Sequence, residues 1–441
     1  MTHKPTVALV HYEEPLLSVR KAADLSGGLD HLPAGGKVFV KPNVIFWTRE
    51  TIFPKYGVIT TSRLMEDAVV LLKERGIDDI TIGEGLVTRS PKDRETPLHA
   101  FETLGYNKLN KRYGVKVLDL HQRRFEDVDL GDGVTLAFNT DFLETDFLVN
   151  IPVLKCHAQT IVSLGIKNLK GLVDIPSRKK CHSDDPTRDL HFMVGKLANR
   201  IPPSLTILDG IYTNERGPLY DGKARRTDAL VASSDTLAAD MIGSQILGHP
   251  PSEIPHLVHA ARDLGRSLDP SGIELRGEAI EDFAHYHEHA FPYADDGTLP
   301  LPMEKMGIQG LSYPKYDLSL CTYCTPINGA TLYSIAMGWK GQPWDDVEVL
   351  TGKTMKPTPG KKKTILLGKC MYQANKDHPD IQEMIAVKGC PPRPKAIIDA
   401  LHKAGIEVDP AHLEGVDNYP GTFMKRYEKR PEFQESFYTI D

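Results

Sequence analysis

Short apolar runs that favour β-strands alternate with helix-like segments along the first half of the chain. The expected strands are residues 7–13, 37–46, 78–85, 115–120, 146–154 and 205–211. Between two of them, residues 61–76 predict an amphipathic helix that Ser62 caps and Gly76 ends. Strands that alternate with helices form a mostly parallel sheet with helices on both faces. We therefore expect an α/β fold.

Polar clusters follow several of these expected strands. In a parallel sheet the carboxyl ends of the strands share one edge, where ligand sites form. Lysines there can hold a carboxylate or phosphate, histidines can move protons, and carboxylates can orient both groups. The predicted catalytic residues are Lys155, His157, Lys167 and His182. The predicted substrate- or anion-binding residues are Lys41, Asn43, Glu84, Asn168, Asp209 and Glu215.

Four of the six cysteines lie in the last third of the chain. Cys321 and Cys324 form a C-x-x-C pair, with Cys370 and Cys390 further along. Thiolates gathered in this way usually hold a metal ion or an iron–sulfur cluster. Two close C-x-x-C pairs would favour zinc, but this chain has one, and a cysteine followed by proline is common among cluster ligands. We predict a 4Fe-4S cluster on these four cysteines, with structural zinc or unrelated thiols as the alternatives.

The segment around the last two cysteines also resembles a known cluster site. Its sequence, LLGKC…VKGCPPRPKAIIDAL, is similar to the cluster-binding end of the small cluster-carrying subunit of respiratory complex I and of nickel–iron hydrogenase small subunits. In those proteins a GCPPRP-type loop supplies a cluster cysteine. The spacing of Cys321 and Cys324 departs from that pattern. The resemblance therefore implies cluster binding, without the quinone or hydrogen chemistry.

The order of features along the chain predicts three segments. Residues 1–267 hold the alternating pattern and should form the α/β domain with its anion or substrate pocket. Residues 268–319 are rich in proline, glycine and charge, which is typical of a linker or extension. Residues 320–441 carry the four cysteines and are expected to form a small iron–sulfur cluster domain.

The motifs of the first domain resemble a widespread prokaryotic family called domain of unknown function 362. They are VKPNV, TTSRLMEDAVVLLKERG with ITIGEG, NIPVLKCH…TIVSLGIKNLKGLVDIPSRKKCH, ILDGIYTNERGPLYDG and ASSDTLAADMIGSQILG, in that order. Members of that family often carry cluster-binding ferredoxin-like modules, which agrees with the cysteines found here. The family as a whole has no assigned activity.

A second resemblance concerns the order His157, Lys167, His182, which is similar to the site region of the lactate racemase family. Those enzymes use a histidine as acid and base, together with a nickel cofactor tethered to a lysine. The glycine pair that precedes the tethering lysine is absent here, because Gly165 and Ile166 stand before Lys167. The resemblance implies a shared fold with an anion site at the same place.

Composition limits the partners and the location that we expect. The net charge of -6 provides no basic field for nucleic acid. The N-terminus lacks an apolar signal core, and no run reaches the roughly 20 apolar residues that a membrane helix needs. We therefore expect a cytoplasmic protein without nucleic-acid partners or membrane insertion, whose cysteines stay reduced.

These features together predict an iron–sulfur oxidoreductase of anaerobic metabolism. It would act on, or pass electrons to, a small anionic organic substrate or cofactor in the α/β domain, with a ferredoxin-like or other redox partner. One alternative is a metal-dependent isomerase, racemase or lyase in which the cluster is structural. Another is an electron-transfer or assembly protein with no substrate of its own. The sequence leaves the formation of a homo-oligomer open.

Overall fold

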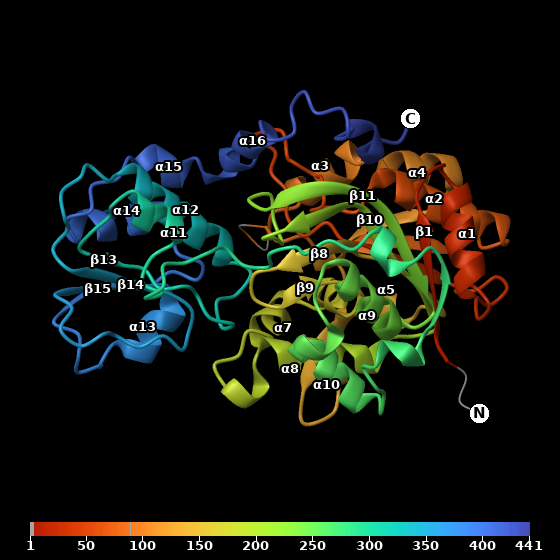
Figure 1. Cartoon of the computed structure of the whole chain (residues 1–441), viewed down its shortest axis with the longest axis horizontal. Helices are drawn as coiled ribbons and strands as arrows, with labels where there is room; N and C mark the ends of the chain where they lie inside the picture. The colour runs from red at the N-terminus through yellow and green to blue at the C-terminus, as the bar shows by residue number, and fades with distance from the viewer. Residues whose placement is uncertain (1–3, 89, 91) are drawn as a thin grey trace. The chain divides into compact units, whose positions relative to one another are not determined.

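The computed structural model describes residues 4–88, 90 and 92–441, and contacts within the chain divide it into two compact units (Figure 1). Unit 1 comprises Met1–Arg178, His191–Ala290 and Pro420–Asp441. Unit 2 comprises Lys179–Leu190 and Phe291–Tyr419. The predicted segments follow one another along the chain, whereas each unit combines segments that are far apart in sequence.

Unit 1 contains a ten-stranded sheet. Its strands are β1 (Thr6–His11), β2 (Val38–Pro42), β3 (Ile80–Glu84), β4 (Lys116–Asp119), β7 (Phe147–Ile151), β8 (Val153–His157), β9 (Ile161–Ser163), β10 (Ser204–Glu215), β11 (Lys223–Ser233) and β12 (Glu274–Gly277). The main path runs β12-β1-β11-β10-β7-β2-β3-β4, and β8 pairs with β10 and β9. Pairing is parallel from β10 through β4, while β11 is antiparallel to both its neighbours. The prediction of an α/β fold with a mostly parallel sheet is confirmed.

The central strands of this sheet are buried on both faces. Every residue of β2, β7 and β8 is buried, and successive residues of a strand point to opposite faces. The helices of the unit are α1 (Leu17–Ser26), α2 (Ser62–Glu74), α3 (Glu95–Thr103), α4 (Tyr106–Tyr113), α5 (Thr140–Leu143), α6 (Gly165–Asn168), α9 (Thr236–Ile246) and α10 (Pro255–Asp263). Two groups of contacting helices cover the sheet, α1 to α4 and α6 with α9 and α10 (Figure 1). A separate hairpin pairs β5 (Phe125–Asp129) with β6 (Thr135–Asn139).

Two local expectations are corrected by the structure. The helix predicted over residues 61–76 spans Ser62–Glu74, and its N-cap is Thr61 rather than Ser62. The Thr61 backbone N–H donates to the Asp209 carboxylate at 2.7 Å, so a distant side chain caps the helix. The run predicted as one strand over residues 146–154 forms the two strands β7 and β8, which Pro152 separates because proline has no N–H for the ladder.

Unit 2 has its own sheet and core. Strands β13 (Leu311–Ser312), β14 (Val347–Leu350), β15 (Lys363–Leu367) and β16 (Glu383–Val387) lie in chain order and are all parallel. The helices are α11 (Leu301–Lys305), α12 (Thr325–Met337), α13 (Lys369–Asn375), α14 (Pro394–Lys403) and α15 (Pro410–Glu414). Apolar residues of these strands and helices, including Ile335, Val349, Ile365 and Ile397, form one buried cluster.

Three helices lie at the boundaries between the units along the chain. They are α7 (Ile175–Lys180), α8 (Leu190–Lys196) and α16 (Tyr419–Met424). After α16 the chain belongs to unit 1 again. None of the helices in the described part of the chain has the length and apolar character that crossing a membrane requires.

Candidate functional site

The carboxyl ends of β2 and β3 place Lys41 and Glu84 together in the interior of unit 1. The Lys41 Nζ lies 2.9 Å from Glu84 Oε2 and also donates to the Pro42 carbonyl at 2.6 Å. Glu84 accepts two further bonds, from the backbone N–H groups of Val44 and Gly85, each at 2.8 Å. Burial lowers the pKa of Lys41, and the Glu84 carboxylate opposes that shift. These two predicted anion-site residues therefore form an enclosed ion pair.

The segment after α6 packs tightly against this pair. A Cβ atom on Gly171 would lie 2.8 Å from both the Lys41 Nζ and Glu84 Oε1. Only glycine leaves room at that position, because real Cβ atoms do not approach other atoms so closely. The ion pair is thus covered by backbone, without space for a ligand directly against it at this point.

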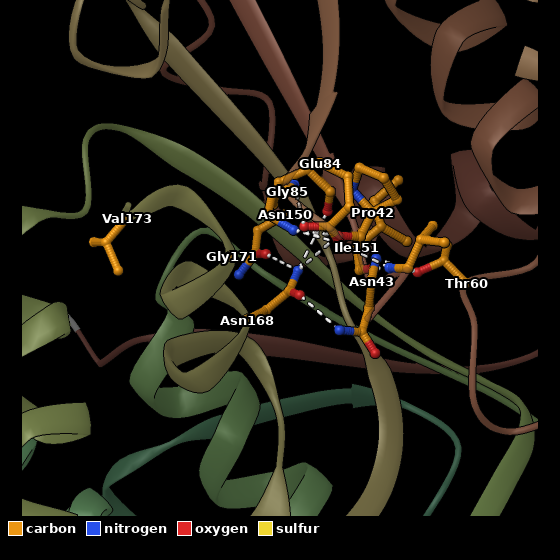
Figure 2. Close-up of polar contacts among 12 residues, drawn as sticks. Pro42, Asn43, Thr60, Glu84, Gly85, Asn150, Ile151, Asn168, Gly171 and Val173 are labelled. Carbon is orange, nitrogen blue, oxygen red and sulfur yellow. Dashed lines mark hydrogen bonds and ion pairs between the residues drawn. The ribbon is translucent and has the colours of Figure 1, made fainter. Parts of the chain in front are cut away.

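Three asparagines form a hydrogen-bonded chain beside the ion pair (Figure 2). Asn168 Nδ2 donates to Asn150 Oδ1 at 2.9 Å, and Asn43 Nδ2 donates to Asn168 Oδ1 at 3.1 Å. Asn150 Nδ2 in turn donates to the Gly165 carbonyl at 3.1 Å. The Asn43 Oδ1 is buried and accepts no hydrogen bond from the described residues. The predicted residues Asn43 and Asn168 are brought together, with one unused acceptor at the end of the chain.

Lys155 lies in the middle of β8, and its side chain is fully buried. Its Nζ donates to the Val58 carbonyl at 2.6 Å. Burial lowers the pKa of this amine to about 7, against a smaller opposing effect of the Glu84 charge. A lysine near pKa 7 exists partly as the neutral amine at physiological pH, which is the form that acts as a base or nucleophile.

His157 ends β8 and is almost fully buried. Its Nδ1 accepts hydrogen bonds from the backbone N–H groups of Gln159 at 3.1 Å and Thr160 at 3.4 Å. Because Nδ1 acts as an acceptor, the proton of the neutral ring resides on Nε2. The local turn therefore selects one tautomer, as proton transfer by this histidine would require.

Two buried aspartates hold the backbone around these residues. Asp240 accepts from the N–H groups of Gly165 at 2.6 Å and Ile166 at 2.9 Å, at the start of the short helix α6 that carries Lys167. Asp209 accepts from Thr61 at 2.7 Å and Ile211 at 3.2 Å. Burial raises the pKa of Asp240 to about 7 and that of Asp209 to about 6. Both carboxylates position backbone segments within unit 1.

The remaining predicted residues of the pocket lie in different places. Lys167 is buried on α6, where its positive charge contributes to the low pKa of His256. Glu215 ends β10, with its Oε1 3.8 Å from the Lys223 Nζ. His182 belongs to unit 2, whereas Lys155, His157 and Lys167 belong to unit 1.

The four predicted cluster cysteines all lie in unit 2, at or near helix N-termini. Cys324 is the N-cap of α12, and Cys321 precedes it in the same turn, with the Cys324 N–H donating to the Cys321 carbonyl at 2.9 Å. Cys370 is in the first turn of α13, and Cys390 lies in the loop before α14. The Lys369 N–H donates to the Gly389 carbonyl at 2.9 Å, which joins the segments that carry Cys370 and Cys390.

The charges of the four thiols act on one another. The pKa of Cys324 is raised first by its hydrogen bond with Cys321 and by burial, then by the charges of Cys321, Cys390 and Cys370. The pKa of Cys370 is raised mainly by burial, while the nearby amines of Lys353 and Lys179 oppose the shift. Residues from four separate positions in the sequence thus share one electrostatic environment.

Unit 2 surrounds these thiols with a lysine and a histidine from the Lys179–Leu190 segment. Lys179 Nζ lies 3.9 Å from Cys390 Sγ and 5.2 Å from the centre of the Tyr323 ring. His182 lies within hydrogen-bonding distance of the Leu318 carbonyl, at 2.9 Å, and of Thr322 Oγ1, at 3.3 Å. Thr322 stands between Cys321 and Cys324, so His182 braces the C-x-x-C turn.

A single metal ion and a four-iron cluster require different spacings between the sulfurs that hold them. A single zinc ion with bonds of about 2.3 Å draws its sulfurs to within about 4 Å of one another. Among the described residues, no group of three or more His, Cys, Asp or Glu side chains is arranged to hold one ion. A four-iron cube keeps its cysteine sulfurs further apart, and four thiols whose charges act on one another fit its chemistry.

The motifs at the strand ends lie in the part of the chain that is similar to known proteins. Residues 38–245 match the family model described as "Domain of unknown function (DUF362)". The chain is also 29% identical over 264 residues to the thylakoid-associated protein sll1697 of Synechocystis sp., which covers 59% of this chain and 77% of that protein. The resemblance predicted from the motifs is confirmed for this segment.

Residues 38–245, which match that family model and are called the DUF362 segment below, contribute to both units. It contains the whole polar network of unit 1 and also Lys179–Leu190, which belongs to unit 2. Cys321, Cys324, Cys370 and Cys390 lie outside the matched residues. The cysteines are therefore an addition to the DUF362 segment in sequence, although that segment supplies Lys179 and His182 to their surroundings.

Sequence reasoning missed Arg178, which lies in the same DUF362 segment. This buried guanidinium donates to the carbonyls of Gly85 and Gly171 at 2.6 Å each, and to Val173 at 3.0 Å. Its charge adds to the lowering of the Lys41 pKa. In the sequence, Arg178 is visible as a basic residue within IPSRKKCH. Its role depends on the loops that its side chain joins, which the sequence does not reveal.

Proposed function

We propose that this protein is an iron–sulfur protein that binds one 4Fe-4S cluster through Cys321, Cys324, Cys370 and Cys390. It would serve as an oxidoreductase that exchanges electrons with a small anionic substrate or cofactor bound by the α/β unit. A ferredoxin-like protein would be its redox partner. Two observations in unit 2 carry this proposal. Backbone hydrogen bonds join Cys321 to Cys324 and the Cys370 segment to the Cys390 segment, and the charges of the four thiols act on one another.

The bound cluster would supply or accept one electron at a time. Within unit 2, the Lys179 amine would donate to the Cys390 sulfur and offset negative charge there. His182 would hold the turn that presents Cys321 and Cys324. In unit 1, the Lys155 amine and His157 are the groups with the chemistry to exchange protons, because one has a pKa near 7 and the other a selected tautomer.

Anaerobic purification followed by iron and acid-labile sulfide analysis tests the cluster. We expect about four iron and about four sulfide per chain, with a loss of both in Cys390→Ser. Cys181→Ser is the matched control, since Cys181 is a buried cysteine of unit 2 outside the predicted set. Zinc without sulfide would contradict the proposal, as would equal metal loss in the two variants.

A second candidate is an electron-transfer protein without a substrate of its own. The enclosed positions of Lys41 and Lys155, both with no exposed surface, favour it. Under this alternative, Lys155→Met and His157→Gln would leave electron transfer to a ferredoxin intact, while Cys390→Ser would abolish it. The oxidoreductase proposal expects substrate turnover to fall in all three variants.

We place the protein in the cytoplasm. The relative's name connects that protein with thylakoids, so attachment to a membrane surface is the competing expectation. Fractionation of the native cells, with immunodetection of the chain in the supernatant and pellet, separates the two.

A further inference from the structure

A cavity of about 290 Å³ lies in unit 1, away from the enclosed Lys41–Glu84 pair. The end of β10, the start of β11 and the C-terminal segment form its walls. It is lined by Glu215, Lys223, Ala224, Arg225, Arg226, His287, Arg430, Glu432 and Phe433. Its volume is close to the lower end of the range for small-molecule sites.

Hydrogen bonds attach the C-terminal wall to the hairpin. The Tyr212 hydroxyl donates to the Glu432 carbonyl at 2.9 Å and accepts from the Gln434 N–H at 3.0 Å. The Ala224 N–H donates to the Tyr427 hydroxyl at 3.0 Å. Two tyrosines, one on each wall, thus tie the segment in place, so the cavity is part of the folded unit.

Positive charge exceeds negative charge in the lining. Four cationic side chains face two carboxylates, and most of the cations have a carboxylate partner. Lys223 lies 3.8 Å from Glu215, and Arg430 donates to Glu432 at 2.9 Å. Arg226 bonds to Asp228 and also donates to the Tyr212 hydroxyl at 2.8 Å.

Arg225 differs from the other three cations. Its Nη2 lies 2.7 Å from His285 Nε2, and no carboxylate among the described residues pairs with it. A guanidinium only donates, so the histidine Nε2 is the acceptor in this contact. Arg225 therefore keeps an uncompensated charge at a cavity, where an anion would gain charge-assisted hydrogen bonds.

The apolar residues of the lining are Ala224 and Phe433. Phe433 is largely buried and stacks on Tyr212, with ring centres 5.6 Å apart and planes at 19°. Arg226 is held over the Phe437 ring at 4.4 Å, which limits its movement. Arg430 lies over the Phe433 ring at 4.8 Å, so only a small part of that ring is left to the cavity. This apolar part beside the uncompensated Arg225 suits an organic anion better than an inorganic one.

We propose that this cavity binds a small organic anion, whose carboxylate or phosphate contacts Arg225 while its carbon skeleton lies against Phe433. The site is built entirely within unit 1. It does not require the proposed cluster, so the binding experiment and the iron assay can fail independently.

Isothermal titration calorimetry of the full chain tests this site with benzoate, phenyl phosphate and neutral benzyl alcohol. We expect saturable binding of benzoate or phenyl phosphate and none of benzyl alcohol; the better of the two anions identifies carboxylate or phosphate as the preferred group. Arg225→Gln should weaken that binding about tenfold or more. Arg262→Gln is the control, because Arg262 is an exposed arginine of the same unit outside the cavity.

Circular dichroism should show that both variants keep the fold of the parent protein. The proposal is overturned if neither anion saturates below about 10 mM. It is also overturned if benzyl alcohol binds as well as the anions, or if Arg225→Gln and Arg262→Gln weaken binding equally. Phe433→Leu provides a second variant, which should weaken phenyl phosphate more than inorganic phosphate if the skeleton lies on that ring.

Discussion

Lys179 Nζ lies 3.9 Å from Cys390 Sγ, although 211 positions separate the two residues in sequence. A cation at this distance stabilises extra negative charge on the sulfur and on any cluster attached to it. The DUF362 segment therefore supplies a charge that bears on the proposed redox centre.

Replacement of Lys179 should change the redox potential of the proposed cluster. We expect Lys179→Met to lower it by on the order of 50 mV, about 1 kcal/mol for one electron, because the reduced cluster loses a neighbouring cation. A redox titration followed by electron paramagnetic resonance measures the shift. Lys180→Met removes the same charge from the next, exposed residue and should change the potential less. Equal shifts would contradict a local effect of Lys179.

The buried amine of Lys155 should make the free energy of unfolding increase as the pH rises above 7. Its folded-state pKa of about 7 lies below the ordinary value of 10.5, so between these values the unfolded chain binds a proton that the folded chain does not. Stability therefore rises with pH across that window, by up to about 5 kcal/mol. Urea unfolding from pH 7 to 10 should show this rise in the parent protein and a smaller one in Lys155→Met. A parallel dependence in both proteins would refute the assignment.

Removal of one partner of the Lys41–Glu84 pair should strongly lower the free energy of unfolding. Lys41→Met leaves a buried carboxylate without its cation, and we expect a loss of about 3–5 kcal/mol in the free energy of unfolding. The double variant Lys41→Met with Glu84→Gln removes both charges and should lose less than the sum of the single changes. A double-mutant cycle by denaturant titration measures the coupling. Additive losses would mean that the two side chains act separately.

Asp240 should contribute to stability by holding the start of α6. Asp240→Ala leaves the Gly165 and Ile166 N–H groups without their acceptor, at a cost of about 2–3 kcal/mol. Asp240→Asn keeps one acceptor oxygen and should lose about half as much. Thermal unfolding by circular dichroism compares the two. If Asn and Ala are equally destabilising, the carboxylate has a role beyond these hydrogen bonds.

Much of unit 1 follows from local patterns. Apolar runs identified the strands β1, β2 and β3, because a buried strand is apolar along most of its length, and also the more exposed strand β4. Polar residues directly after such runs had to gather at one edge of a parallel sheet, and Lys41 with Glu84 does so. What the pattern could not predict was their enclosure, which depends on Gly171 and Arg178 from a later loop.

Other features escaped prediction because their partners are far away in sequence. Ser62 was the expected cap, yet Thr61 takes that position and Asp209 satisfies its N–H. The order of His157, Lys167 and His182 predicts that they share a site, but the His182 ring contacts Leu318 and Thr322 in the other unit. Arg225 had no local signal at all, since a cavity needs a second wall, and residues 430–433 provide it.

By itself the sequence determined the α/β class, the DUF362 resemblance and the identity of the residues with useful chemistry. The hydrophobic periodicity, the turn residues and the order of the motifs are properties of the sequence itself, so they do not depend on how distant segments pack. Tertiary structure alone decided that Lys179–Leu190 joins the cysteine unit and that the C-terminal segment returns to unit 1. It also decided which lysines are enclosed and which arginine stays uncompensated, because burial and charge pairing arise only when distant segments meet.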